Sequence, residues 1–289
     1  MSSTFKSVAI IGRQNTADIS KTLEDLIKHL QRKKIDIVLE NDTAKILPDH
    51  KIHAVSREQL SEHCELIIVV GGDGSLLNAA RTAVRQNLPI VGVNRGKLGF
   101  LADIAPDNIN KIDAILAGEF YEEQRFLLAT EMNDKDNAIV RNLALNDVVF
   151  LSCIAGQMID FSVHVEQQFL CNYHADGLII ATPTGSTAHA LSGGGPILHS
   201  ALEAIVLVPM LSHNLSSRPI VINNESAIEV IFNNVDTADL LVRCDGQVQT
   251  MLHGGSVKIK KAKEKLRLLH PIDYNYFETL RSKLHWETK

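Results

Sequence analysis

The stretch from Gly71 to Ser75 limits the possible folds more than any other part of the sequence, because three glycines and one acid join two differently patterned segments. Before it, Leu66 to Val70 form a continuous apolar run, which is typical of a strand buried on both faces. After it, apolar residues recur at helical spacing, at Leu76, Leu77, Ala80 and Val84. The pattern predicts a strand, a tight glycine turn and a helix.

This turn has the composition of a phosphate-binding loop with one unusual member. Glycines let the backbone approach a ligand and direct N–H groups at it, and the start of a helix adds positive potential that favours phosphate. Asp73 would repel phosphate, so a carboxylate here needs another task, such as accepting a proton from an attacking hydroxyl or contacting a metal ion. The structural alternative is a tight turn in which Asp73 only caps the helix.

Up to about residue 120, strand and helix patterns alternate, which indicates a parallel sheet with helices on its faces. The expected strands are Val8–Gly12, Ile35–Leu39, Leu66–Val70 and Pro89–Asn94. The expected helices are one over Ile19 to Leu30 that Asn15 caps, one after the glycine turn, and Asp107–Leu116 with Gly118 at its end. Residues 41–65 read as loops and a short helix. A second glycine-rich loop, Asn94 to Leu101, leaves the end of a strand, where ligands of such sheets bind.

After about residue 122 the sequence becomes rich in short apolar strands. They are Phe126–Met132, Ala138–Leu145, Val148–Leu151, Met158–Val165, Leu178–Thr182, Ile220–Ile222, Ala227–Phe232, Leu240–Cys244, Val257–Ile259 and Leu266–Leu269. Tyr274 to Leu284 is helical again. We therefore expect a Rossmann-like α/β domain over 1–122, with the C-terminal helix within 272–289 packing back on it, and a β-rich domain over 123–271.

Composition narrows the function. The 289 residues carry a formal net charge of −5, so no basic excess favours nucleic acid. No segment has the length and apolar character of a signal peptide or a membrane span. The four cysteines lack CxxC spacing, so we expect no zinc site and read them as reduced thiols of a cytoplasmic protein.

Two polar motifs of the β-rich half could hold a nucleoside. Asn146-Asp147 lies where one strand gives way to the next, and an acid beside an amide can hold both hydroxyls of a ribose. A plain polar turn is the alternative. Asp245-Gly246-Gln247 follows another strand and, taken alone, is a hairpin signal.

The stretch from Asp176 to Pro196 is the strongest candidate for a nucleotide site. A strand is followed by Thr182-Pro183-Thr184-Gly185-Ser186-Thr187-Ala188 and then by three glycines and a proline. Small side chains allow close approach of a flat ligand, and their hydroxyls suit an adenine edge or phosphate oxygens. The run lacks the GxxxxGK[ST] spacing of a Walker loop. His174 and His189 flank the strand, and a Ser/Gly-rich surface loop is the alternative.

In this order, the motifs resemble those of the bacterial NAD kinase family over about 200 residues. The resemblance rests on Gly71-Gly72-Asp73-Gly74, Asn94-x-Gly96-x-Leu98-Gly99-Phe100-Leu101, Asn146-Asp147, Asp176 to Ala188, Gly193-Gly194-Gly195-Pro196, Ser217-Arg218-Pro219, Asp245-Gly246-Gln247 and Leu269 to Phe277. The glycine turn alone is shared with diacylglycerol kinases and resembles part of the phosphofructokinases, to whose folds the family is related.

The resemblance implies transfer of phosphate from ATP to the 2′-hydroxyl of the adenosine ribose of NAD, giving NADP, with 123–271 as the dinucleotide-binding domain. The resemblance also implies that Asp73 is the proton acceptor and that Mg²⁺ is bound mainly through ATP phosphates rather than protein ligands. It further implies a homodimer or homotetramer. It also implies that Asp176 reaches the nicotinamide end across a subunit interface. The implied contact residues are Asp73, Gly74, Phe100, Asn146, Asp147, His174, Asp176, Thr184, Thr187, Ala188, His189, Ala190, Leu191, Ser192, Asp245 and Gln247.

Two positions depart from the family's pattern. His189 stands where Tyr is usual, and imidazole is a smaller platform for stacking. Position 174 is often basic in relatives and is His here, only partly charged at neutral pH. Two other functions share parts of these motifs: a lipid-type kinase, which the lack of membrane-facing stretches disfavours, and a non-catalytic dinucleotide sensor, which would gain nothing from Asp73.

Overall fold

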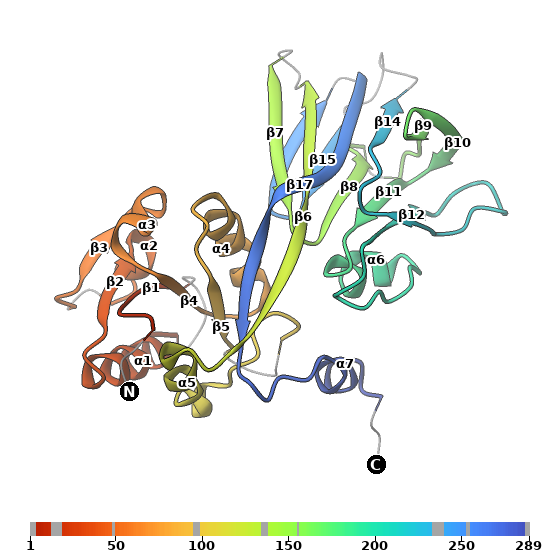
Figure 1. Cartoon of the computed structure of the whole chain (residues 1–289). Helices are drawn as coiled ribbons and strands as arrows, with labels where there is room; N and C mark the ends of the chain where they lie inside the picture. Colours follow the sequence, from red (N-terminus) through yellow and green to blue (C-terminus); the bar gives the residue numbers. More distant parts are fainter. Residues whose placement is uncertain are drawn as a thin grey trace. The chain divides into compact units, whose positions relative to one another are not determined.

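The computed structural model describes residues 4–12, 19–47, 50–94, 99–133, 138–154, 156–232, 240–252 and 255–286. The chain forms two compact units, Met1–Gln124 together with Leu266–Lys289, and Arg125–Lys265 (Figure 1). Residues 266–271, which we assigned to the β-rich domain, belong to the first unit, because Leu268 pairs with Ile90 in its parallel sheet. No helix of the described segments is both long and apolar enough to cross a membrane.

A parallel sheet forms the centre of the first unit. Its strands follow the order β3-β2-β1-β4-β5 and continue to β17. Their bounds are β1 Ser7–Gly12, β2 Asp36–Glu40, β3 His53–Val55, β4 Leu66–Val70, β5 Ile90–Val93 and β17 Gly255–His270. Every residue of β4 is buried, as its uninterrupted apolar sequence predicts for a strand between two others.

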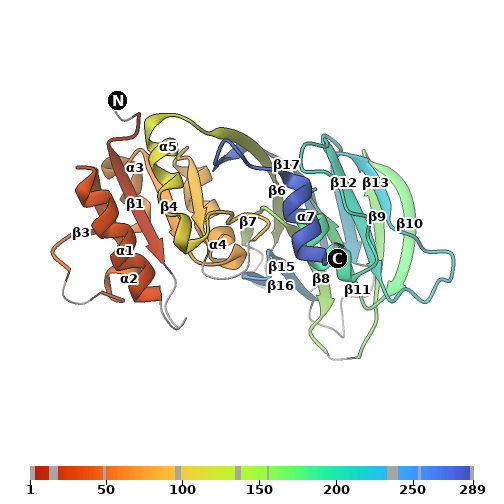
Figure 2. The same ribbon diagram turned by 90° about the horizontal axis from the view of Figure 1, so that it is seen from below.

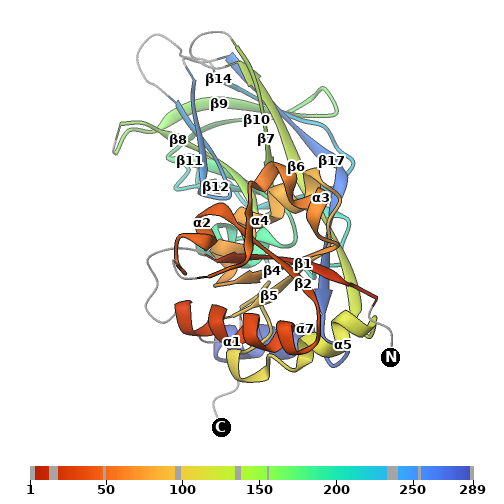
Figure 3. The same ribbon diagram turned by 90° about the vertical axis from the view of Figure 1, so that its left-hand side faces the viewer.

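Helices cover both faces of this sheet, with α1 and α5 on one face and α3 and α4 on the other (Figures 1 and 3). The helices are α1 Ile19–Arg32, α2 Asn41–Ala44, α3 Leu60–His63, α4 Asp73–Arg85, α5 Lys111–Ala117 and α7 Tyr276–Leu284, with 3₁₀ turns η1 Arg57–Gln59 and η2 Pro106–Asn108. α5 ends at Gly118, whose φ of +94° is the left-handed helix end that the sequence predicts. Asn15, the expected cap of α1, lies outside the described residues.

The second unit contains an antiparallel sheet in the order β13-β12-β11-β8-β15-β16 and the strands β6, β7, β9, β10, β14 and β17 of the other sheet. Figure 2 shows β9 beside β10 and β12 beside β13. The bounds are β6 Tyr121–Asn133, β7 Ile139–Ala144, β8 Asp147–Ser152, β9 Ile159–Val165, β10 Gln168–Ala175, β11 Gly177–Ala181, β12 Ala204–Met210, β13 Ile220–Asn223, β14 Ile228–Phe232, β15 Leu240–Cys244 and β16 Val248–Leu252.

One core lies between these two sheets and a smaller one lies on the outer face of the six-stranded sheet. Phe150 and Phe161 are among the largest fully buried side chains of the first core. In the second, Ile179 and Val208 pack against Ala190 and Leu198. The segment that follows β11, with η3 Gly185–Thr187 and α6 His189–Ser192, therefore covers that outer face.

The structure adds strands that we did not predict and merges two that we did. β3, β10, β12 and β16 are additional, and the expected strands Val257–Ile259 and Leu266–Leu269 are one strand, β17. β10 is an edge strand with many exposed residues, so it lacks a clear apolar pattern. The residues between the two expected strands are rich in lysine and mostly exposed, so they lack the apolar pattern that would have joined the two strands.

Candidate active site

Asp73 joins the two glycine-rich loops of the first unit. It is the first residue of α4, directly after β4 and the two glycines. Its Oδ2 accepts the N–H of Phe100 at 3.0 Å, and its Oδ1 accepts those of Leu101 and Ala102 at 3.1 and 3.3 Å. Three backbone donors therefore set the orientation of one carboxylate.

Gly99 makes this close approach possible. A Cβ at Gly99 would lie 2.1 Å from Oδ1 of Asp73, so no larger residue fits while the loop stays in place. The loop is closed by the N–H of Gly99, which donates to the carbonyl of Ala102 at 2.8 Å, and by Nδ2 of Asn94, which donates to the same oxygen at 3.1 Å. Gly96 and Leu98, also part of this motif, lie outside the described residues.

In the second unit, Asp245 holds the Asn146-Asp147 turn. Its carboxylate accepts the backbone N–H groups of Leu145, Asn146 and Asp147 at 3.1, 2.7 and 3.4 Å. Asp245 and Gly246 have φ of +55° and +66°, the signature of a tight type I′ hairpin turn between β15 and β16. The motif therefore forms the hairpin turn that its sequence predicts, and its first residue, Asp245, also holds the Asn146-Asp147 turn in place.

The surroundings of the Asp147 carboxyl group disfavour its ionised form. The residue is only 4% exposed. Burial, reinforced by the negative charge of Asp245, raises the pKa of Asp147 to about 7. Acidic residues with such strongly raised pKa values cluster at functional sites, because an unpaired buried charge lowers the stability of a fold.

The threonine-rich run packs directly on this turn. The N–H of Thr182 donates to the carbonyl of Asn146 at 2.9 Å, and its hydroxyl donates to that of Leu145 at 2.6 Å. A Cβ on Gly185 would lie 2.1 Å from the Asn146 carbonyl oxygen, so the glycine allows this contact. The structure thus brings Asn146, Asp147 and Asp245 together with the start of the run.

Arg125 is a residue of this cluster that sequence reasoning missed. It lies on β6, is 4% exposed, and donates from Nη1 to the hydroxyl of Thr184 at 3.0 Å. The hydroxyl of Thr187 in turn donates to the Thr184 carbonyl at 3.2 Å. A charged residue immediately before the apolar run at Phe126 was the available signal.

The rest of the run alternates between exposed and buried positions. His189 and Ser192 are exposed, Ala188 and Leu191 are partly buried, and Gly74, Phe100 and Gln247 are partly buried elsewhere. The methyl group of Ala190 is fully buried in the outer core, so its side chain does not face a ligand.

His174 and Asp176 lie away from this cluster. They precede β11, whereas the threonine-rich run follows it, so the five residues of β11 separate them by roughly 17 Å. His174 is exposed and its Nδ1 lies 2.8 Å from Oδ1 of Asp160. Within one chain these two residues therefore cannot join the Asn146-Asp147 turn at one small ligand group.

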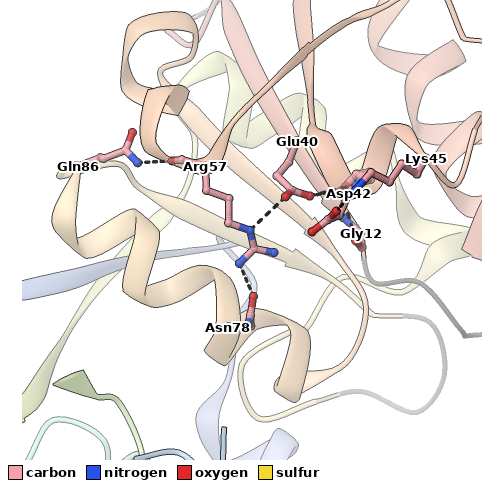
Figure 4. A network of polar contacts seen from close by, with 8 residues as sticks. Gly12, Glu40, Asp42, Lys45, Arg57, Asn78 and Gln86 are labelled. Carbon is pink, nitrogen blue, oxygen red and sulfur yellow. Dashed lines mark hydrogen bonds and ion pairs between the residues drawn. The ribbon is translucent and has the colours of Figure 1, made fainter. Parts of the chain in front are cut away.

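A polar network that the sequence did not reveal supports α4 (Figure 4). Glu40, buried at the end of β2, accepts from the backbone and hydroxyl of Thr43 at 3.1 and 3.0 Å, and Nε of Arg57 donates to it at 3.2 Å. Arg57 also donates to Asn78 on α4. The N–H of Gly12 donates to the Thr43 hydroxyl at 2.8 Å, which ties the end of β1 into the network.

Comparisons with known proteins agree with this architecture. The family models for the ATP-NAD kinase N-terminal and C-terminal domains match residues 8–120 and 145–271. An NAD kinase of Legionella pneumophila is 46% identical over 293 residues, covering 100% of this chain and 99% of that protein. An NAD kinase of Archaeoglobus fulgidus, solved with ATP, has a TM-score of 0.75 at 27% identity and covers 98% of this chain and 100% of its own.

A yeast NADH kinase solved with NADH shares the fold, with a TM-score of 0.88 at 20% identity, covering 98% of this chain and 88% of its own. An α/β unit with a glycine turn and a β-rich unit of this kind define a nucleotide-using phosphotransferase. The chain belongs to the NAD kinase family. It is an enzyme that phosphorylates NAD, and neither a lipid-type kinase nor a non-catalytic sensor is favoured.

Proposed function

We propose that Asp73 accepts the proton of the ribose 2′-hydroxyl as phosphate is transferred from ATP. The supporting observation is the orientation of its carboxylate by three backbone donors, of which only one binds Oδ2. A carboxylate oxygen has about two acceptor sites, and among the described residues Oδ2 accepts one hydrogen bond, so one acceptor site would remain for a hydroxyl. For a general base, a position within hydrogen-bond reach of the proton is the first requirement, and a suitable pKa is the second.

Phosphoryl transfer needs mostly positioning and stabilisation of charge. The start of α4 beside Gly74 would face phosphate oxygens, which favour a helix N-terminus. Within the described segments no three His, Cys, Asp or Glu side chains gather as a metal site. We propose that Mg²⁺ enters with ATP and takes most of its ligands from phosphate and water, because this ion keeps much of its hydration and binds readily to substrate phosphates, where it would neutralise developing charge.

The Asn146-Asp147 turn would hold the adenosine ribose whose 2′-hydroxyl reacts. An ionised Asp147 accepts from hydroxyls, while the Asn146 amide both donates and accepts. Asp245 would keep the turn in place through its three backbone contacts. The side chains of Thr184, Thr187, Ala188, His189, Leu191, Ser192 and Gln247, together with the backbone of Ala190, would contact the rest of the dinucleotide.

We further propose that the enzyme is a homo-oligomer in which His174 and Asp176 serve the site of a partner subunit. Their separation from the Asn146-Asp147 turn by the length of β11 supports this. Light scattering after size exclusion tests the oligomeric state. All four cysteines are free thiols, which supports a reducing compartment such as the cytoplasm, and cell fractionation tests that location.

The deciding experiment for Asp73 is the Asp73→Asn variant, assayed with NAD, ATP and Mg²⁺ by enzymatic detection of NADP. We expect NAD to bind as before and kcat to fall roughly 10²- to 10⁴-fold, the range for loss of a general base. Asp42→Asn, on the surface of the same unit, is the control. A near-normal kcat in Asp73→Asn would remove Asp73 from this role.

A further inference from the structure

A buried histidine lies between two buried carboxylates at the end of β17. The side chain of His270 is fully buried, with Nδ1 2.7 Å from Oδ2 of Asp103 and Nε2 3.2 Å from Oε2 of Glu123. A neutral imidazole carries only one N–H, and carboxylates only accept. With Asp103 and Glu123 both ionised, both contacts are hydrogen bonds only when His270 is a positively charged imidazolium.

The surroundings of His270 favour that charged form. Burial acts against the charge, but the hydrogen bonds and negative charges of Asp103 and Glu123 outweigh it, so the pKa of His270 is raised above its ordinary value. Of the described residues, Tyr274 and Tyr121 also face the imidazole with their titratable side chains, with ring centroids at 3.9 and 6.2 Å. Aromatic faces attract a cation.

Asp103 connects this cluster to the site of Asp73. It directly follows Ala102, whose N–H donates to Asp73 and whose carbonyl closes the loop from Gly99. In the described part of the chain, His270 is the only hydrogen-bond partner of the Asp103 carboxylate, whose buried Oδ1 has none. His270 therefore sets the orientation of the Asp103 carboxylate.

We propose that protonated His270 is a positioning residue for catalysis: it holds Asp103, and thereby the Phe100–Ala102 backbone that orients the Asp73 carboxylate. It does not touch the substrate. The proposal rests on the proposed role of Asp73. The double hydrogen bond is intact at low pH and is lost as pH rises through the raised pKa of His270, so the kcat of the enzyme should fall on the alkaline side.

The test compares His270→Gln and Asp103→Asn with wild type, with kcat measured at saturating NAD and ATP from pH 6 to 9. We expect kcat to fall roughly 10- to 100-fold, the effect of misplacing a reacting group by about an ångström, while KM for NAD changes little. The alkaline fall of kcat should vanish in His270→Gln. It should move to lower pH in Asp103→Asn, because that variant removes one of the charges that raise the pKa.

Two controls separate positioning from general damage. His29→Gln removes a second His–Asp pair of the same unit, in which Nε2 of His29 lies 2.6 Å from Oδ1 of Asp113. It should keep the wild-type kcat and pH profile. Leu280→Ala removes a buried side chain of α7. It should lower the thermal stability as the His270 variant does, but it removes no titrating group, so it shows how much kcat falls through destabilisation alone.

Wild-type kcat and pH profile in both His270→Gln and Asp103→Asn would overturn the proposal, as would a loss no greater than in Leu280→Ala. If His270→Gln does not fold, the nearly isosteric Asp103→Asn decides alone. Asp73→Asn, assayed beside them, distinguishes the two possible failures. A normal kcat in Asp73→Asn refutes the role of Asp73 itself. If Asp73→Asn loses activity while His270→Gln and Asp103→Asn keep the wild-type kcat, only the positioning by His270 is refuted.

Discussion

Asp147 should make NAD affinity depend on pH near neutrality. Its carboxyl, buried beside Asp245, has a pKa of about 7, so the ligand-free enzyme is partly protonated there. If the ribose hydroxyls bind the ionised form, the fraction ready to bind rises from roughly one tenth at pH 6 to roughly nine tenths at pH 8. The Kd for NAD should therefore fall roughly tenfold over that range, with release of a proton on binding.

The ionisation of Asp147 should have the opposite effect on the stability of the protein: rising pH should strengthen NAD binding but lower the free energy of unfolding. The unfolded chain ionises Asp147 near its ordinary value of 3.8, while the folded chain keeps the proton until about 7. The free energy of unfolding therefore falls as pH rises through this window. Three pKa units at about 1.4 kcal/mol each set an upper limit of about 4 kcal/mol at pH 8. Asp147→Asn should be more stable than wild type at pH 8 and gain nothing at pH 4.

Isothermal titration with NAD at pH 6, 7 and 8, in buffers of different ionisation enthalpy, measures both the affinity and the released proton. Chemical denaturation at pH 4 and 8 measures the stability. Asp147→Asn should bind NAD more weakly and without the pH dependence, whereas the surface variant Asp42→Asn should behave as wild type. A pH-independent Kd in wild type, or an equal slope in Asp147→Asn, would refute the reasoning.

Three other substitutions probe close contacts of the site. Gly99→Ala places a methyl group against the Asp73 carboxylate and should lower kcat roughly 10²-fold in the NADP-forming assay. Gly185→Ala presses on the Asn146 carbonyl and should lower the free energy of unfolding, measured in urea, by roughly 1–3 kcal/mol while raising KM for NAD. Arg125→Met removes the buried donor beside the threonine-rich run and should raise KM for NAD more than it lowers kcat; an unchanged KM would make Arg125 purely structural.

Strands and turns with a strong local pattern could be predicted from the sequence. β4, the glycine turn and α4 follow one another within 20 residues, and each has its own periodicity or turn chemistry. Gly118 ended α5 as expected because a left-handed helix end needs only a residue without Cβ. Edge strands such as β10 escaped prediction because exposure removes the apolar signal.

The sequence by itself determined the two-part architecture, the family, and the identity of Asp73 and the Asn146-Asp147 turn as candidate site residues. Only the tertiary structure decided what these groups contact. Asp73 meets the backbone of residues 27 to 29 positions away, Asp245 meets Asn146 from 99 positions away, and His270 meets Asp103 from 167 away. Such pairings depend on strand order and register, which are set by the packing of the whole sheet and not by the pattern of any one segment.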